Sequence, residues 1–541
     1  MTGIRRLFSA RPRVRFSFDS AHNQYGSLLT VRGLLCLAVL ACGWLQSGAT
    51  ITRSTLADTK PAADPKKSAD EEWSVIYMGK TRVGYSRSNT VNVKRDDREL
   101  IRSESESTML IKRFGQELKM KLSISTEETL DGQLVTVEFK NENPPVSFTR
   151  TTGKVNGDKL DLLIENAGKT SKKTIKWDPE NKSPAYQDRL LQEQPLKTGE
   201  KRQFKVFLPE MNQVATVSIT AQAADETTLL DGVKHKLQRI DITQSVLPGF
   251  VTKTWIDAEG HTLKSSTGGF FGSDMSTYRV SREEALKEIA GAELDIAIDT
   301  LIKIQPPIQR AHDSQEIVYF VTLKGHNPAT EIPTSDTQTI KSTGPETAEL
   351  TVTAARPTAA AADPAKTVAA SFSTPNRYLQ SDDPRVIKHA EAAAAGATAP
   401  WDVAVKMEQY VHETLNKKNF STALATAAEV AESLEGDCTE HACLLAAMCR
   451  VKKIPSRVVV GFVYADRLEA FGGHMWTEVF INGKWIPLDA TLGMGGIGAA
   501  HIKLADTGFQ DEGAPPTASF LPILRVIGNM DLKVKTVTYR K

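Results

Sequence analysis

The 541-residue sequence predicts an α+β protein in which mostly antiparallel β domains precede a domain of helices packed on an antiparallel sheet. From Trp73 to about Lys287, runs of alternating apolar residues are separated by turn dipeptides, a pattern typical of hairpins. After an Ala/Pro-rich linker at residues 356–371, the apolar period changes from two to 3.6, which indicates helices. Strand-like segments then return.

The bulk composition places few limits on function. Hydrophobic residues make up 40% and charged residues 24% of the chain, which is ordinary for globular protein. The chain is long enough for several domains, and no internal repeat stands out. The formal net charge is only +2, so the composition gives no reason to expect a nucleic-acid partner.

Residues 1–50 are expected to form a signal peptide or a signal anchor. The apolar run at residues 33–45 suits a signal h-region and is short for a membrane span. It is followed by Ser47-Gly48-Ala49, and Val39-Leu40-Ala41-Cys42 weakly resembles a lipoprotein box. The preceding arginines are Arg5, Arg6, Arg11, Arg13, Arg15 and Arg32. We therefore expect an exported protein, periplasmic, in the cell envelope or membrane-anchored.

A flexible linker is expected at residues 51–72, and an antiparallel β domain at residues 73–288. This domain contains no cysteine and few histidines, so binding or spacing is a better expectation for it than chemistry. A small β-sandwich is expected at residues 289–355. The hairpin turns of the first β domain are expected at Asp131-Gly132, Asn156-Gly157, Asp231-Gly232 and Asp257-Ala-Glu-Gly260.

After a linker at residues 356–380, the catalytic core is expected at 381–508, with further strands at 509–541. The tail is expected to extend the core sheet or to lie at its edge. Helices are predicted from Asp383, over Trp401–Leu415, over Ala425–Leu434, and from Gly436-Asp437-Cys438 with Asp437 as N-cap. Strands are predicted for RVVVGFVYA, HMWTEVFI and KWIPLDAT, the last two joined by a turn at Asn482-Gly483.

Three cysteines lie close together at Cys438, Cys443 and Cys449, and the expected mature chain has no others. They do not form CxxC pairs, and with His441 they lack the usual spacing of zinc ligands, so no metal is expected. Cys443 and Cys449 fall among Ala, Leu and Met, where small buried hydrophobic residues are the simplest interpretation. Cys438 needs a different explanation.

A nucleophile, a base and an orienting acid can be placed at the boundaries of predicted elements. Cys438 begins a predicted helix, where the macrodipole and free N–H groups favour a thiolate. A thiolate nucleophile needs a neighbouring base, and that base needs an orienting group. His474 opens one predicted strand and Asp489 ends the next, so the hairpin between them can bring the two side by side.

The ordered motifs GDCTEHACLLAAMCR, IPSRVVVGF, GGHMWTEVF and GKWIPLDAT resemble the transglutaminase-like core superfamily, over roughly residues 383–505. The resemblance implies a papain-like fold, with Cys438 as nucleophile, His474 as general base and acid, and Asp489 as the residue that orients the histidine. It also implies a structural Arg457. Trp476, Glu478 and Gly473 are candidates for the substrate cleft.

Two positions depart from the family pattern. Lys453 stands where the family usually has a glycine that ends the helix of the nucleophile, and a left-handed cap costs lysine about 1 kcal/mol more than glycine. This helix is therefore expected to end differently. Ala490 stands where a proline often follows the aspartate. Neither position touches the chemistry.

Several nearby residues have simpler interpretations. His441 and Glu440 follow Cys438 on the same helix and are expected to be a part-exposed polar residue and a first-turn acid. The GMGGIG stretch at residues 493–498 matches GxGxxG, but no βαβ unit surrounds it, so a flexible loop at the mouth of the cleft is expected and no cofactor. His501 is expected to be structural, with a substrate contact as the alternative.

The resemblance implies acyl transfer through a Cys438 thioester, with hydrolysis or transfer of a peptide, isopeptide or glutamine amide bond. A protein or peptide substrate is then the expected partner, and the β domains would position it. Two other classes stay open: a catalytically silent envelope scaffold, and a metal-dependent hydrolase, for which clustered ligands are lacking.

Overall fold

The structure is a computed structural model. It describes residues 71–540 except 114, 144–146, 167–168, 271, 290–293, 357–366, 418–424 and 510–520. The expected signal segment and the linker up to residue 70 therefore lie outside the described residues. The expected α+β class is confirmed: antiparallel sheets dominate, and the helices of the core follow the β-rich region. Within the described part of the chain, no helix is both long enough and apolar enough to span a bilayer.

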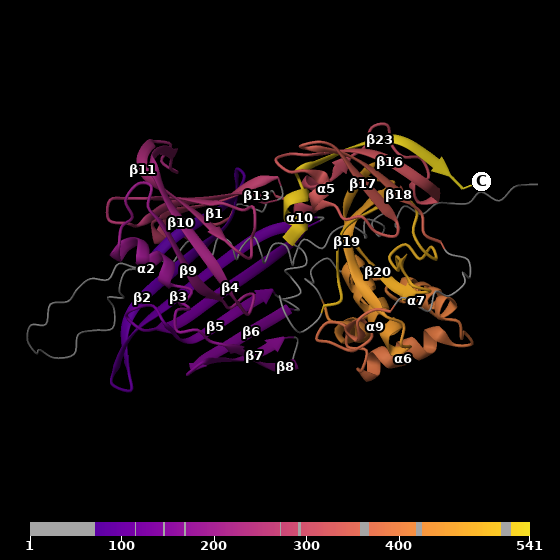
Figure 1. The fold of residues 1–541 in the computed structure, drawn as a ribbon, viewed down its shortest axis with the longest axis horizontal. Helices are drawn as coiled ribbons and strands as arrows, with labels where there is room; N and C mark the ends of the chain where they lie inside the picture. The colour runs from indigo at the N-terminus through magenta and orange to yellow at the C-terminus, as the bar shows by residue number, and fades with distance from the viewer. Residues whose placement is uncertain are drawn as a thin grey trace, which may run out of the picture.

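The first half of the molecule is one antiparallel sheet of 14 strands (Figure 1). Its first and last strands, β1 and β14, pair with each other in the middle of the sheet, so two meanders run outward to β8 and to β9. The strands are β1 (Glu72–Met78), β2 (Thr81–Arg95), β3 (Arg98–Arg113), β4 (Gln116–Glu128), β5 (Leu134–Asn143), β6 (Ser147–Asn156), β7 (Lys159–Asn166), β8 (Lys169–Lys176), β9 (Lys201–Leu208), β10 (Gln213–Thr228), β11 (Lys234–Gln244), β12 (Thr252–Ile256), β13 (Thr262–Phe270) and β14 (Ser273–Val280).

The predicted turns join consecutive strands of this sheet. Asp131-Gly132 lies between β4 and β5, and Asn156-Gly157 between β6 and β7, with both glycines at positive φ. The sheet is curved, because its two ends meet: Trp177, just after β8, packs against Phe207 of β9 at 6.0 Å between ring centroids. The backbone of Lys182 also exchanges hydrogen bonds with β9, at 2.8 and 3.1 Å. Helix α2 (Tyr186–Glu193) buries Leu190 and Leu191 in the main hydrophobic core, and α3 (Arg282–Ala285) follows β14.

The second sheet differs from the expected sandwich. Its four strands form a single antiparallel layer in the order β17-β18-β16-β23. These strands are β16 (Ser314–Leu323), β17 (Gln338–Gly344), β18 (Thr347–Thr353) and β23 (Met530–Tyr539). The tail therefore joins this sheet and not the core sheet, because β23 pairs with β16 from Leu323–Met530 to Ser314–Tyr539. Figure 1 shows β23 in yellow lying beside β16.

Three short helices connect the second sheet to its surroundings. They are α4 (Ile296–Asp299), η1 (Ala311–Asp313) and α5 (Pro328–Glu331). The short strand β15 (Ile302–Lys303) leaves this region and pairs with the third sheet. Since β15 belongs to the third sheet and also lies against β23 of the second, the two sheets are in contact and the second is not an independent sandwich.

The third unit is a bundle of helices packed on a sheet. The sheet has the order β15-β20-β19-β22, and β21 also pairs with β20. Helix α9 packs on β20 and β19, while α6, α7 and α8 surround α9. The elements are η2 (Ala370–Phe372), α6 (Pro384–Ala394), α7 (Pro400–Thr414), α8 (Ala427–Ser433), α9 (Cys438–Val451), β19 (Ser456–Ala465), β20 (Ala470–Ile481), β21 (Lys484–Leu488), β22 (His501–Thr507) and α10 (Leu521–Val526).

Local signals in the sequence explain most of these boundaries. Asp383 caps α6 by accepting a hydrogen bond from the Arg385 amide, and Pro384 occupies the first helical position. Asn482 and Gly483 both have positive φ, at 54° and 77°, as a tight hairpin turn between β20 and β21 requires. The predicted helices and strands of the core are thus present within a few residues of their expected ends.

Candidate active site

Helix α9 presents Cys438 as its first residue. The Asp437 carboxylate accepts a hydrogen bond from the Thr439 amide at 2.8 Å, and Glu440 Oε2 accepts one from the Asp437 amide at 2.9 Å. This reciprocal capping box fixes the first turn of the helix. Gly436 is needed beside it, because a Cβ there would lie 2.3 Å from the Cβ of Glu440. The sequence therefore holds the thiol at the positive end of a helix dipole.

His441 is buried, where a part-exposed polar residue was expected, while Glu440 is the first-turn acid that was expected and is buried as well. Burial raises the pKa of Glu440 well above its ordinary value, and the negative charge of Asp437 adds to the effect. Glu440 also accepts a hydrogen bond from the Ala425 amide at 3.2 Å. His441 Nδ1 lies 2.6 Å from the Asp437 carbonyl oxygen, so its ring is held on its own helix. Neither residue sits on open surface, because α8 packs against α9 and the Ala425 amide bonds Glu440.

His474 and Asp489 meet across the β20–β21 hairpin. The β20–β21 ladder ends at Thr477–Leu488, and Asp489 follows directly, so its carboxylate reaches back along β20. His474 Nε2 donates a hydrogen bond to Asp489 Oδ2 at 2.8 Å. His474 was expected to open its strand. It lies inside β20 instead, because the strand begins at Ala470. The predicted contact is nevertheless formed.

The second ring nitrogen of His474 faces the thiol. Cys438 is close enough to raise the pKa of the ring, and we assign the thiol to Nδ1 because Nε2 is bound to Asp489 and Nδ1 has no hydrogen-bond partner. Burial alone would lower the pKa of His474, but the charges of Asp489 and Cys438 outweigh it and raise this pKa to about 10. The pKa of Asp489 is held well below its usual range, against the effect of burial, chiefly by His474. The arrangement therefore favours the charged form of the imidazole, held by the Asp489 carboxylate on one side and next to the Cys438 thiol.

The other two cysteines are chemically quiet. Both are free, fully buried and surrounded by the helix bundle. Burial raises the pKa of Cys443 well above its ordinary value and that of Cys449 to about 12. They remain neutral thiols at ordinary pH.

A second histidine, His501, bonds the same carboxylate. Its Nε2 lies 3.0 Å from Asp489 Oδ2, and both residues are fully buried. Asp489 Oδ1 accepts the Thr491 amide at 2.9 Å, and the Asp489 amide donates to Glu408 Oε1 at 3.0 Å. His501 was expected to be structural or to contact the substrate, and its bond to Asp489 was not predicted.

Glu408 of α7 is another buried group that sequence reasoning missed. It accepts backbone N–H groups from Asp489, Gly495 and Gly496 at 3.0, 2.8 and 3.5 Å. Burial and the negative charge of Asp489 raise the pKa of Glu408 to about 8. Because Glu408 binds both ends of the 489–496 loop, it fixes the backbone that carries Asp489.

The GMGGIG stretch was expected to be a flexible loop. Instead, the Glu408 carboxyl group holds it in place through the amides of Gly495 and Gly496. Ile497 also forms a two-hydrogen-bond bridge with Ala355, at 3.0 Å in both directions. A Cβ on Gly496 would lie 2.1 Å from the Ala355 carbonyl oxygen, so glycine allows this approach. The glycines therefore serve backbone packing beside the site.

The candidate cleft residues are part of the buried layer behind the triad. Trp476 stacks on the His474 ring at 6.2 Å and 23°, and meets the His501 ring edge-on at 5.4 Å. Gly473 pairs with Phe462 inside the sheet. Glu478 is buried in ion pairs, so the structure assigns its carboxylate to other protein groups and not to an open cleft.

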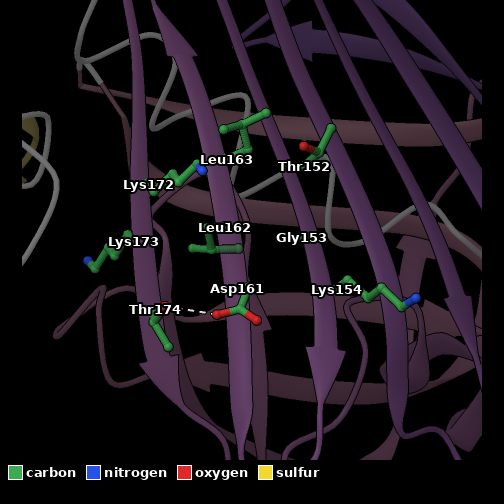
Figure 2. Close-up of a pocket in the computed structure, with 9 residues that line it drawn as sticks. All are labelled: Thr152, Gly153, Lys154, Asp161, Leu162, Leu163, Lys172, Lys173 and Thr174. Atoms are coloured by element: carbon green, nitrogen blue, oxygen red, sulfur yellow. Dashed lines mark hydrogen bonds between the residues drawn. The ribbon is translucent and has the colours of Figure 1, made fainter.

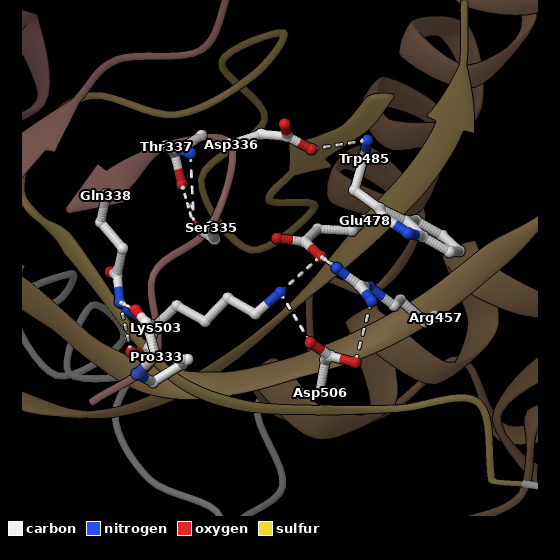
Figure 3. Close-up of polar contacts among 10 residues, drawn as sticks. All are labelled: Pro333, Ser335, Asp336, Thr337, Gln338, Arg457, Glu478, Trp485, Lys503 and Asp506. Atoms are coloured by element: carbon white, nitrogen blue, oxygen red, sulfur yellow. Dashed lines mark hydrogen bonds and ion pairs between the residues drawn. The ribbon is translucent and has the colours of Figure 1, made fainter. Parts of the chain in front are cut away.

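The ion pairs of Glu478 belong to a closed ring of four charges (Figure 3). Glu478 contacts Arg457 and Lys503 at 2.7 and 2.8 Å, and Asp506 contacts the same two bases at 3.0 and 2.8 Å. The guanidinium of Arg457 lies 4.0 Å over the Trp485 ring. Two acids and two bases balance, which is what allows such charges to be buried.

The charged ring also sits against the second sheet. The Gln338 amide exchanges hydrogen bonds with the backbone of Lys503, both at 2.9 Å, as Figure 3 shows. Asp336 accepts the Trp485 amide at 3.1 Å. The second sheet is therefore fastened to the core sheet through the backbone of β22 and β21.

The three triad residues are closed from solvent, each 0% exposed. An open depression of about 440 Å³ lies elsewhere, on β6, β7 and β8 (Figure 2). It combines Leu162 and Leu163 with Lys154, Lys172 and Lys173. Its strands contribute no residue to the triad, so we do not assign it to the chemistry.

A metal could in principle use the same carboxylate. The ligand atoms of His474, Asp489 and His501 all lie within 4.8 Å of one another, and Asp257, Glu259 and His261 form a second such group on the turn between β12 and β13. In the buried group, both Nε2 atoms lie at hydrogen-bonding distance from Oδ2, at 2.8 and 3.0 Å, so an ion would have to replace both of these contacts. The expectation that no metal is used stays a prediction.

A cysteine at a helix N-terminus, facing a histidine and an aspartate from an antiparallel sheet, defines the papain-like class of thiol sites. Residues 387–490 match the family model described as the transglutaminase-like superfamily, which confirms the resemblance for this segment. No curated protein matches the chain.

Three solved structures are similar over parts of the chain. A candidate cysteine protease from Cytophaga hutchinsonii has 15% identity and a TM-score of 0.28, covering 42% of this chain and 92% of its own. A β-barrel-like protein of unknown function from Brucella abortus has 12% identity and a TM-score of 0.29, covering 39% and 96%. A candidate protease from Parabacteroides distasonis has 11% identity and a TM-score of 0.18, covering 65% and 63%.

Proposed function

We propose that this chain is a thiol acyl-transfer enzyme that cleaves or transfers peptide, isopeptide or glutamine amide bonds. The observation that carries the proposal is the unbroken contact series from the first residue of α9 through His474 to Asp489. An N-terminal helix position, a histidine with one nitrogen free for the thiol and a fixed carboxylate are what nucleophilic catalysis by cysteine requires.

In the proposed reaction, the Cys438 sulfur attacks the amide carbonyl carbon and a tetrahedral oxyanion forms. His474 Nδ1–H then gives its proton to the leaving amine as the C–N bond breaks, which leaves a thioester. Water or a second amine attacks this thioester, His474 takes the proton of the attacking group, and the thiolate returns. The Cys438 backbone N–H is our candidate for one oxyanion donor.

A protein or peptide is the proposed substrate. We propose that the enzyme uses no cofactor and has no nucleic-acid partner. The 14-stranded sheet would hold a polymeric substrate near the core, and we propose an exported, periplasmic, envelope or membrane-anchored location. Because the triad is fully buried, part of the surrounding structure has to move before a substrate reaches Cys438. A silent scaffold is the competing proposal, and it predicts an unreactive thiol.

The test is the pH dependence of Cys438 alkylation by iodoacetamide, read by peptide mass spectrometry so that Cys443 and Cys449 serve as internal references. We expect wild type to keep reacting at Cys438 as the pH falls below 7, and His474→Ala to lose this reaction. If the two proteins give the same pH profile, the ion pair does not form and the scaffold becomes the better account. We compare the shape of the two pH profiles and not the absolute rates, because burial of Cys438 slows alkylation equally in wild type and in His474→Ala.

A further inference from the structure

Two imidazoles donate to one oxygen of the triad carboxylate. His474 Nε2 and His501 Nε2 lie 2.8 and 3.0 Å from Asp489 Oδ2, and all three side chains are fully buried. A hydrogen bond to a carboxylate needs a proton on the donor, so each ring carries its proton on Nε2. Only one of these rings faces the thiol, which leaves the second without a part in the proposed reaction.

The position of His501 is fixed by its surroundings. It begins β22, where it pairs with Val463 of β19. Its ring meets Trp476 edge-on at 5.4 Å and 83° and His312 at 5.8 Å and 67°. The His312 carbonyl oxygen is held in turn by the Arg356 guanidinium. A ring clamped in this way can aim one N–H at a chosen oxygen.

The charges around His501 keep it neutral while His474 is charged. Burial and the positive charge of His474 lower the pKa of His501, and Asp489 only partly offsets this. Burial and His501 likewise lower the pKa of His312 to about 4. Glu408 is a further ionisable group close to Asp489, behind the loop backbone, and His312 also interacts electrostatically with Asp489. One imidazolium and one neutral donor therefore share the carboxylate.

We propose that His501 is a positioning residue, which fixes the Asp489 carboxylate in the single orientation that points the free nitrogen of His474 at Cys438. This inference rests on the proposed function. With His501 in place, Oδ2 is bound by two donors, Oδ1 by the Thr491 amide, and the Asp489 backbone by Glu408. Without it, Oδ2 keeps a single buried donor and the carboxylate is free to rotate away from His474.

The experiment compares His501→Phe, which keeps a ring against Trp476 but has no donor, with His501→Gln, whose amide keeps an N–H near the Nε2 position. The readout is the pH profile of Cys438 alkylation. His501→Phe should lower the rate at pH 6 by about tenfold, equivalent to one lost hydrogen bond to a charged group. His501→Gln should retain most of the wild-type rate.

A merely structural His501 would lower the melting temperature of both variants and leave the pH profile unchanged, and that result would overturn the proposal. This outcome can be told apart from failure of the proposed function, because in that case wild type and His474→Ala would already give the same pH profile. If His501→Phe does not fold, ¹⁵N-histidine NMR of the wild-type protein decides instead. An Nε2–H signal from both buried rings, with His474 doubly protonated and His501 protonated at Nε2 alone, would support the shared carboxylate, and an Nδ1–H tautomer at His501 would refute it.

Discussion

At the scale of single residues, the site is a matter of where protons and charges are held. Burial alone would lower the pKa of His474, but its contacts with Asp489 and Cys438 outweigh burial and raise this pKa. Asp489 is anionic because donors occupy both of its oxygens. Removing any one partner leaves another buried group unpaired, which costs more than the contact itself contributes.

The pH dependence of stability should report the charge on His474. Its pKa rises from about 6.5 in the unfolded chain to about 10 in the folded protein, so the folded state binds the proton more tightly. The resulting stability is fully present below pH 6.5 and is lost as the pH rises towards 10. The difference in unfolding free energy between wild type and His474→Gln should therefore shrink over this interval. A difference that stays constant from pH 6 to pH 10 would show that His474 is neutral in the folded protein.

Lys453 is strained in a way that a substitution can relieve. The family usually has glycine here, and the helix was expected to end differently with lysine; instead Lys453 takes the left-handed conformation, with φ of 61°. Its amide still bonds the Arg450 carbonyl oxygen at 3.0 Å. Lys453→Gly should stabilise the protein by about 1 kcal/mol in denaturant unfolding.

Lys452 provides the matched control for that substitution. It is the preceding residue, with φ of −87°, so glycine there gains no conformational relief. Lys452→Gly should destabilise the protein by roughly 0.5–1 kcal/mol. Equal effects of the two substitutions would mean that the left-handed position carries no strain.

At the scale of elements, α9 matters because its first turn is both a structural cap and the support of the nucleophile. Asp437→Ala removes the side-chain acceptor of that cap and should cost about 1–2 kcal/mol of unfolding free energy. It should also slow Cys438 alkylation below pH 7, since the turn that positions the thiol loses its support.

The N-cap of α6 offers the control for this prediction. Asp383 accepts a hydrogen bond from the Arg385 amide at 3.0 Å, and no triad residue lies near it in the sequence. Asp383→Ala should lower stability by a similar amount and leave Cys438 alkylation unchanged. If both variants slow alkylation equally, the effect comes from general loosening and not from the first turn of α9.

The same elements show which features of the molecule can be predicted from sequence. Caps and turns depend on neighbouring residues, so Asp383, Asp437 and Asn482-Gly483 were found correctly. The contact of His474 with Asp489 could be predicted because both residues belong to one hairpin, which brings them together locally. His501 and Glu408 were missed, since their contacts with Asp489 depend on how β22 and α7 pack in space. No local pattern carries that information.

At the scale of the whole molecule, the second sheet joins distant parts of the chain. β23 pairs with β16 and covers an edge that would otherwise be open, and Met530 and Leu532 are buried in the main core. The sequence could place strands in both regions but not pair them, because strand pattern alone does not choose a partner.

Deleting residues 530–541 should therefore destabilise the second sheet and expose β16. Losing the burial of Met530 and Leu532 alone should cost about 3 kcal/mol or more. We expect a lower melting temperature and self-association through the open β16 edge, measured by size-exclusion chromatography. Removing only residues 540–541 should change neither property. A monomeric truncated protein with an unchanged melting temperature would contradict this role for β23.

The pairing of β16 with β23 has a consequence for the order in which the molecule is made. β16 ends at Leu323 and its partner begins at Met530, a gap of 207 residues (530 − 323). At a synthesis rate of about 5–20 residues per second, this edge waits roughly 10–40 s for its partner. During that interval an apolar strand is available to any neighbouring chain. Newly made protein is thus most vulnerable to misassembly just before its final strand arrives, and a chaperone that binds extended strands would act in this window.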